Sequence, residues 1–255
     1  MYAATIGVIY DWLKQLELPA VLLQPRGMDA HEVMLNVRMV RQAARARRIV
    51  AIGGSLEGYL PALERALGKR CPPIMRFMTH LRPTPSDPHL WLDLEQARAC
   101  CALILRWASE DGLLTNRVRQ AWRRMQLLFR QLEVRRDALR TPLQGRYYLA
   151  LHDAYRPLTH RLGMHSLGSL LPHEEQPISL QRLRQLIERA RRVPLACVLS
   201  STSEGLAAAV AQHLRVPLIV ADTLEQYDPE RNYFLRYSNL LTDLQRLAES
   251  LPRVA

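Results

Sequence analysis

Residues 87–93 read Asp-Pro-His-Leu-Trp-Leu-Asp, a loop that leads into a predicted helix. The ring of Pro88 fixes its own φ and favours an extended Asp87, so a stiff turn presents His89. Asp93 then stands at the N-cap position of the helix, with a glutamine three residues later as in a capping box. An imidazole held by a rigid turn suits metal or ligand binding, although a lone histidine is more often a surface residue or one satisfied within the fold.

Upstream of this loop, short apolar runs alternate with helical segments. The predicted strands are residues 4–10, 19–23 and 49–52, and the predicted helices are residues 11–16, 33–46 and 58–67. Such alternation is typical of parallel βαβ units, whose ligands bind beyond the carboxyl ends of the strands. The proline-rich residues 72–86 are predicted to form an extended loop that leads to His89.

Downstream, a helix is predicted over residues 94–109, and residues 115–139 hold the longest helical pattern of the chain. After a break at 141–145 the alternation restarts, with strands at 147–151, 166–170, 196–199 and 217–221 and helices at 179–192, 203–214 and 232–251. We therefore predict an α/β fold of two lobes with parallel sheets, joined by one long helix. The expected division is an N-terminal lobe at 1–112, the connecting helix at 113–141 and a C-terminal lobe at 142–255.

Composition narrows the function classes. A hydrophobic fraction of 48% is normal for a globular protein, and no stretch reaches the ~18 apolar residues of a membrane span. The net charge of +11 is compatible with nucleic-acid binding, but the arginines are scattered over several predicted helices without an aromatic-interleaved basic motif. We expect no nucleic-acid partner. The start lacks a signal-peptide pattern, so the numbering begins after a removed signal peptide or the protein is cytosolic.

The four cysteines give no metal motif. Cys71, Cys100, Cys101 and Cys197 form no CxxC pair, and adjacent cysteines in a helix cannot both face one metal ion. A disulfide between Cys71 and Cys197 is conceivable but not deducible from the sequence. Buried small apolar residues are the simpler interpretation.

Four other residues share one context and are candidate metal ligands. His31, His89, His152 and Asp222 each lie in or just after a loop at a strand end, or at a helix start. Two come from each predicted lobe, so a cleft between the lobes could gather all four. Three imidazoles and one carboxylate suit tetrahedral Zn²⁺, whereas Mn²⁺ prefers more oxygen ligands; copper, nickel and iron also accept imidazole. The separations form no local motif, and each residue alone could be a hydrogen-bonded loop side chain.

Neighbouring carboxylates could orient these imidazoles. Glu32, Asp87 and Asp153 each lie one or two residues from a candidate histidine. A carboxylate that accepts one ring N–H leaves the other ring nitrogen directed at the metal. We therefore expect these three residues to surround the ligands.

The chain resembles the zinc- and manganese-binding solute-binding proteins of bacterial metal ABC importers, over nearly its whole length. The matching segments are LLQPRGMDAHEV at 22–33, SDPHLWLDLEQA at 86–97, YYLALHDAYRPLTHRLGM at 147–164 and VPLIVADTLEQ at 216–226. The second and third are similar to the DPH-x-WLD and strand-HDAY patterns of that family. The chain departs from it in lacking a His/Asp/Glu-rich loop, and in having Ser200-Ser201 and Thr223-Leu224-Glu225 where the family often has glutamate and Pro-Leu-Gly.

This resemblance implies two α/β lobes with a rigid connecting helix and metal capture in the cleft between them. It assigns ligand roles to His31, His89, His152 and Asp222, and the histidine at 152 is similar to the zinc branch more than to the manganese branch. The implied protein is a monomeric, non-catalytic periplasmic or cell-surface receptor that delivers Zn²⁺ to a membrane permease. One alternative is a zinc hydrolase with three histidines, an open site and Asp222 as general base. Another is a non-transport metal chaperone or adhesin-like relative.

Overall fold

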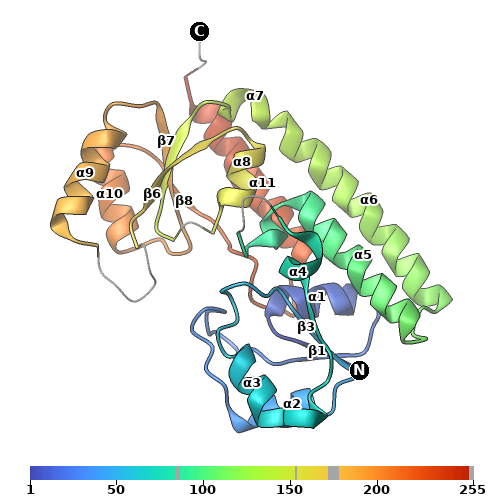
Figure 1. Ribbon diagram of the computed structural model, residues 1–255. Coiled ribbons are helices and arrows are strands. Elements are labelled where there is room, and N and C mark those ends of the chain that lie inside the picture. Colours follow the sequence, from blue (N-terminus) through green and yellow to red (C-terminus); the bar gives the residue numbers. More distant parts are fainter. Residues whose placement is uncertain (84–86, 153, 172–177, 253–255) are drawn as a thin grey trace. The chain divides into compact units, whose positions relative to one another are not determined.

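Two compact α/β units make up the protein. The computed structural model describes residues 1–83, 87–152, 154–171 and 178–252 (Figure 1). The first unit comprises residues 1–130 and 224–235, and the second comprises residues 131–223 and 236–255. Each unit contains its own sheet of four parallel strands, which confirms the predicted fold class. The division differs from the expected boundaries at 112 and 142, because one boundary falls inside the long helix and residues 224–235 return to the first unit.

The first sheet is formed by β1 (Tyr2–Ala4), β2 (Ala20–Leu22), β3 (Arg48–Ala51) and β4 (Ile74–Arg76). Their spatial order is β2-β1-β3-β4, and every neighbouring pair is parallel. The order reverses between β1 and β3. In open parallel sheets this is the position where ligands bind, beyond the carboxyl ends of the strands.

Helices cover both faces of this sheet. They are α1 (Gly7–Gln15), α2 (Val37–Ala44), α3 (Leu60–Leu67), α4 (Phe77–Leu81) and α5 (Leu94–Glu110). One core joins α2 and α3 to the strands through Met39, Ala43, Leu60, Leu63, Ala3 and Ile49. Aromatic side chains link α1, α4 and α5, because Phe77 contacts Trp12 and stacks on Trp107 at 5.6 Å between ring centroids. The turns Gly68–Arg70 and Leu90–Leu92 are short 3₁₀ helices.

Two predicted segments of the first unit were wrong. The strand expected at 4–10 ends at Ala4, and Gly7 begins α1. Its residues are apolar and buried, and periodicity cannot distinguish a strand from a buried helix in such a short run. The extended loop expected at 72–86 contains β4 and α4. Its prolines 72 and 73 precede the edge strand, where a missing N–H is tolerated.

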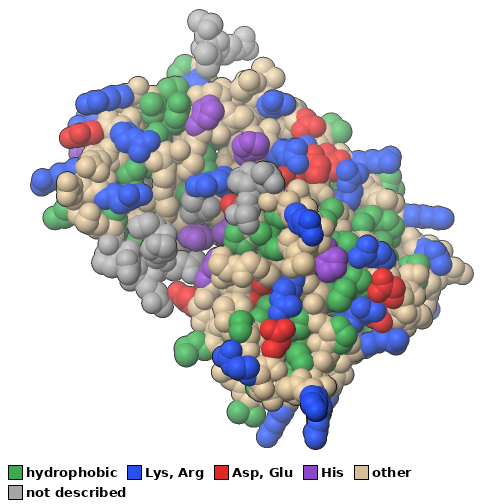
Figure 2. All heavy atoms as spheres, viewed as in Figure 1, with side chains coloured by type: hydrophobic (Ala, Val, Ile, Leu, Met, Phe, Trp, Pro, Cys, Tyr) green, Lys and Arg blue, Asp and Glu red, His purple; other side chains and the backbone are tan. Residues whose placement is uncertain are grey.

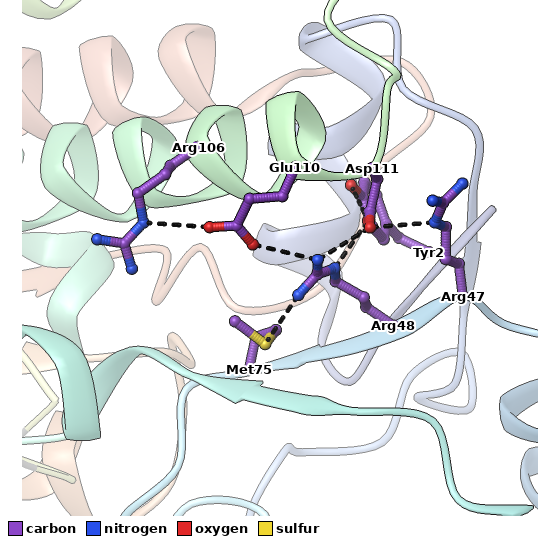
Figure 3. A network of polar contacts seen from close by, with 7 residues as sticks. All are labelled: Tyr2, Arg47, Arg48, Met75, Arg106, Glu110 and Asp111. Atoms are coloured by element: carbon purple, nitrogen blue, oxygen red, sulfur yellow. Dashed lines mark hydrogen bonds and ion pairs between the residues drawn. The ribbon is translucent and has the colours of Figure 1, made fainter.

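A polar network centred on the buried Asp111 stabilises the amino-terminal ends of the strands in the first sheet (Figure 3). The Asp111 carboxylate accepts hydrogen bonds from Tyr2 Oη at 2.8 Å and from Arg48 Nε at 2.7 Å, and it forms an ion pair with Arg47 at 3.0 Å. Glu110 also pairs with Arg48, at 3.1 Å. The network therefore ties the end of α5 to β1 and β3. Arg48 and Tyr2 hold the pKa of the Asp111 carboxyl below its usual value, against the opposing effect of burial.

Replacing Asp111 with asparagine is expected to lower the free energy of unfolding at pH 7 by about 2 to 3 kcal/mol, because a charged acceptor of several hydrogen bonds is lost. The folded-state pKa is lowered, so the contribution of this carboxylate is fully present above about pH 4 and is lost as the pH falls through the folded-state pKa. Urea unfolding of both proteins at pH 7 and near pH 3 measures this. A difference that does not shrink in acid would contradict the assignment.

The second sheet is formed by β5 (Tyr147–Ala150), β6 (His165–Ser169), β7 (Leu195–Ser200) and β8 (Leu218–Val220). Its order, β6-β5-β7-β8, repeats that of the first sheet, and all neighbours are parallel. The same unit contains four shorter helices, which are α7 (Arg140–Leu143), α8 (Arg156–Arg161), α9 (Leu180–Ala190) and α10 (Leu206–Leu214). The core between the sheet and the pair α9 and α10 contains Leu149, Val198, Leu186, Ala190, Val210 and Ala211 (Figure 1).

Two long helices each contain residues of both units. The predicted long helix is confirmed as α6 (Asn116–Ala138), and α11 (Tyr233–Ser250) closes the chain. The start of α11 is fixed in the first unit, because Tyr233 donates its backbone N–H to Asp11 at 2.6 Å and its hydroxyl to the Trp91 carbonyl at 2.6 Å. In the second unit Arg135 of α6 binds the Ser238 hydroxyl of α11. Among the described residues, no helix has the length and apolar character needed to cross a bilayer.

Candidate metal centre

The carboxyl ends of the strands in the first unit carry two of the candidate histidines. His31 lies in the loop after β2, and His89 lies in the loop after β4 and α4. Buried Glu57 holds the segments that follow β1 and β3. Its carboxylate accepts hydrogen bonds from the backbone N–H groups of Ile52 and Gly53, each at 2.8 Å, and from the Thr5 hydroxyl at 2.6 Å. Burial raises the pKa of Glu57, while these hydrogen bonds oppose the rise. No sequence pattern predicted this role of Glu57.

The His31 loop is held by local hydrogen bonds. Gln24 is buried, accepts from the Gly7 N–H at 2.7 Å and donates to the Met28 carbonyl at 2.8 Å. The Asp29 carboxylate accepts the backbone N–H of His31 at 2.9 Å. This turn places the partly buried His31 ring at the sheet edge. A loop with these internal bonds presents an imidazole at little further cost in chain entropy.

His89 is oriented from both sides by its own segment. Asp87 Oδ1 lies 2.9 Å from the backbone nitrogen of His89 and 2.9 Å from its ring Nδ1. The ring is 5% exposed and meets Trp91 edge-on, with centroids 5.3 Å apart. A carboxylate can only accept, so the tautomer that donates from Nδ1 to Asp87 carries the lone pair of the ring on Nε2. The predicted cap also forms, since Asp93 accepts the backbone N–H groups of Glu95 and Gln96 at the start of α5.

The structure brings His31 and His89 together. Their Nε2 atoms are 3.4 Å apart and their ring centroids 5.5 Å apart. Two nitrogens bound to one tetrahedral Zn²⁺ at about 2.0–2.1 Å lie about 3.3–3.4 Å from each other. The separation of these two atoms therefore matches the spacing of two ligands on a single zinc ion.

The other two candidate ligands belong to the second unit. His152 is partly buried and lies two residues beyond β5. Asp222 lies two residues beyond β8 and forms a two-pronged ion pair with Arg236, in which Nε and Nη2 donate at 2.7 and 2.6 Å. Arg236 is buried near the start of α11, and no sequence pattern predicted its ion pair with Asp222. Both carboxylate oxygens of Asp222 thus already accept a charged donor.

The predicted orienting carboxylates differ in outcome. Asp87 contacts the His89 ring as described. Glu32 is exposed and makes no hydrogen bond or ion pair with His31 among the described residues, and Asp29 holds the backbone of His31 instead. The expected contact between Glu32 and the His31 ring is therefore absent among the described residues, and Glu32 is exposed. Asp153 lies outside the described residues.

The cysteines contribute no ligand to the candidate metal centre. All four are free thiols, and Cys100, Cys101 and Cys197 are buried. Burial raises the pKa of every one of them, that of Cys197 to about 12. Metal binding requires the thiolate, so the described chemistry rests on imidazole and carboxylate groups.

Comparison with known proteins agrees with this architecture. The family described as "zinc-uptake complex component A, periplasmic" matches residues 3–247. No curated protein sequence matches the chain significantly.

Solved structures share the fold along the whole chain. The metal-dependent lipoprotein YcdH from Bacillus subtilis is 18% identical, with a TM-score of 0.79 and coverage of 98% of this chain and 99% of that one. The Zn(II)-bound ZnuA-like domain of AdcA from Streptococcus pneumoniae is 19% identical, with a TM-score of 0.79 and coverage of 98% of both chains. The protein FpvC from Pseudomonas aeruginosa, in complex with Mn²⁺, is 16% identical, with a TM-score of 0.83 and coverage of 98% of both. At these identities the similarity establishes the fold alone.

Proposed function

We propose that this chain, which belongs to the family of periplasmic zinc-uptake complex component A, is the receptor of a metal ABC importer and captures Zn²⁺. The observation that carries the proposal is the 3.4 Å separation of the Nε2 atoms of His31 and His89. Both rings come from loops at the carboxyl edge of one parallel sheet, where ligands of such folds bind. In this proposal the metal is cargo, taken up and later released to a membrane permease.

His152 supplies the third imidazole in this proposal. It lies two residues beyond β5, in the HDAY segment that resembles the family pattern. A set of three neutral imidazoles favours Zn²⁺ over Mn²⁺, because Mn²⁺ prefers oxygen ligands. Among the solved structures of similar fold, the AdcA domain is Zn(II)-bound and FpvC is in complex with Mn²⁺.

Asp222 is proposed as the weakest of the four candidate ligands. Its two oxygens bind the Arg236 guanidinium, which competes with a metal ion for the same lone pairs. The same ion pair argues against Asp222 as the general base of a zinc hydrolase. We therefore propose a receptor without catalytic activity, located at the cell surface or in the periplasm.

Zinc affinity is expected to fall by at least about tenfold between pH 7.5 and pH 5.5, because protons compete with the metal for imidazole nitrogens. Competition against a chelator of known zinc affinity at each pH measures the change. A metal site built from carboxylates alone would remain occupied over this range, so a constant affinity would contradict an imidazole site.

Transport itself is tested by zinc uptake in cells that lack this chain. Restoring the wild-type chain should restore zinc uptake and growth in zinc-limited medium, whereas the His31→Ala chain should restore neither. A wild-type chain that binds zinc when purified but restores no uptake would favour the metal-chaperone or adhesin-like alternative.

A further inference from the structure

The solvent-exposed face of α6 carries an apolar ridge. The helix is 23 residues long, about 35 Å at 1.5 Å per residue. Its buried face is formed by Val118, Ala121, Met125, Phe129 and Leu132. On the opposite face Leu127 and Val134 are 60% and 70% exposed. They are seven residues apart, which places them about 20° from each other around the helix axis.

Arginines flank this ridge on both sides. At about 100° per residue, Arg119, Arg123 and Arg130 follow one side of it, and Arg117 and Arg124 follow the other. All five side chains are exposed. Arg124 pairs with Glu17 at 2.8 Å, and the other four make no ion pair or side-chain hydrogen bond among the described residues.

Acidic residues are absent from most of this helix. The sequence of α6 has no Asp or Glu before Glu133, and Asp137 pairs with the adjacent Arg136 at 2.7 Å. Figure 2 shows several Lys and Arg side chains, with a few Asp and Glu side chains among them, on the side where Figure 1 draws α6. The turns of α6 before Glu133 therefore carry positive and no negative side chains around the exposed Leu127, and the exposed Val134 follows seven residues later.

We propose that this face of α6 binds the surface of an anionic lipid bilayer. Guanidinium groups bind phosphate in a forked geometry, and each basic side chain near an anionic surface favours binding. Leu127 and Val134 would enter the headgroup region between the arginines. Because the helix is already packed in the fold through its other face, it can bind only shallowly and reversibly.

A lipid surface fits this face better than a protein partner does. A specific protein interface of standard size buries about 800 Å² on each side around a packed apolar centre. Two aliphatic side chains seven residues apart, flanked by exposed arginines, offer no such centre. The same pattern is typical of a basic helix that lies on a membrane.

The test is co-sedimentation of the metal-free full chain with vesicles. One set contains about 30% phosphatidylglycerol in phosphatidylcholine, and the other contains phosphatidylcholine alone; both are measured at about 0.05 M and 0.5 M salt. We expect binding to the anionic vesicles at low salt, with loss at high salt and none to the neutral vesicles. The double variant R123E/R130E should bind about 30-fold more weakly or worse. L127S/V134S should bind several-fold more weakly.

The control is R182E/R189E, which makes the same charge change on the exposed face of α9. It should retain most of the binding, and all variants should keep wild-type thermal midpoints and zinc affinity. Absence of binding to the anionic vesicles would overturn the proposal. So would equal losses in the α6 and α9 variants, because binding would then follow net charge rather than the α6 face.

Discussion

Replacing His89 with alanine is expected to weaken zinc binding by at least about a hundredfold. The variant removes a proposed nitrogen ligand whose ring is held by Asp87. Loss of an orienting partner alone typically weakens metal binding by about 10- to 100-fold, so loss of the ligand itself has to exceed that range. Competition titration with a zinc chelator measures the effect, and circular dichroism verifies that the variant is folded.

Further variants distinguish the loss of a proposed ligand from the loss of a residue that orients it. Asp87→Asn keeps the ligand but replaces the charged acceptor of its ring N–H, and it should lose about 10- to 100-fold. His152→Ala should behave as His89→Ala does. Asp222→Ala should lose far less, because Arg236 already engages that carboxylate. Equal losses at His89, His152 and Asp222 would contradict this order.

Replacing Gly7 with alanine is expected to lower the free energy of unfolding by about 3 kcal/mol, the upper part of the range for overpacking. A methyl group at this position would overlap the backbone of Gln226 and Tyr227. A rigid backbone cannot move aside as a flexible side chain can, so either α1 or the returning segment at 224–235 has to shift. Urea unfolding of the full chain measures the loss.

The same substitution should also weaken zinc binding at the candidate metal centre. The segment against Gly7 includes Glu225, whose carboxylate accepts the backbone N–H of Ala30 beside His31. A modest loss of zinc affinity is therefore expected in Gly7→Ala. Gly58→Ala is the matched control, because a methyl group there meets nothing within 4 Å. If both variants were equally stable, the close packing of the returning segment on α1 would be wrong.

The fold was predictable because its signals are local and repeated. Buried strands and amphipathic helices alternate, and β3, β5 and β7 lie where the apolar runs predicted them. Local patterns failed where tertiary context decides the structure. β4 forms only by pairing with β3 at a sheet edge. The return of residues 224–235 to the first unit depends on bonds such as Tyr233 to Asp11, across 222 residues of sequence.

In the candidate centre, too, local contacts were predictable from the sequence and contacts set by tertiary structure were not. His89 and Asp87 were predictable together, since two residues of sequence suffice for the carboxylate to contact both backbone and ring. The proximity of His31 to His89 agrees with the general rule for parallel sheets: the loops that follow the strands all leave from the carboxyl ends, where ligands bind. Asp29 and Arg236 were not predicted: Asp29 acts through a backbone turn that has many equivalents in sequence, and Arg236 reaches Asp222 from a helix 14 residues away.

The most direct measurement of the central claim is a titration of the metal-free protein with Zn²⁺, followed by competition with Mn²⁺. The proposal predicts one tightly bound zinc ion per chain that a large excess of Mn²⁺ does not displace. A folded protein that takes up no stoichiometric zinc would contradict the proposal, whatever the spacing of His31 and His89.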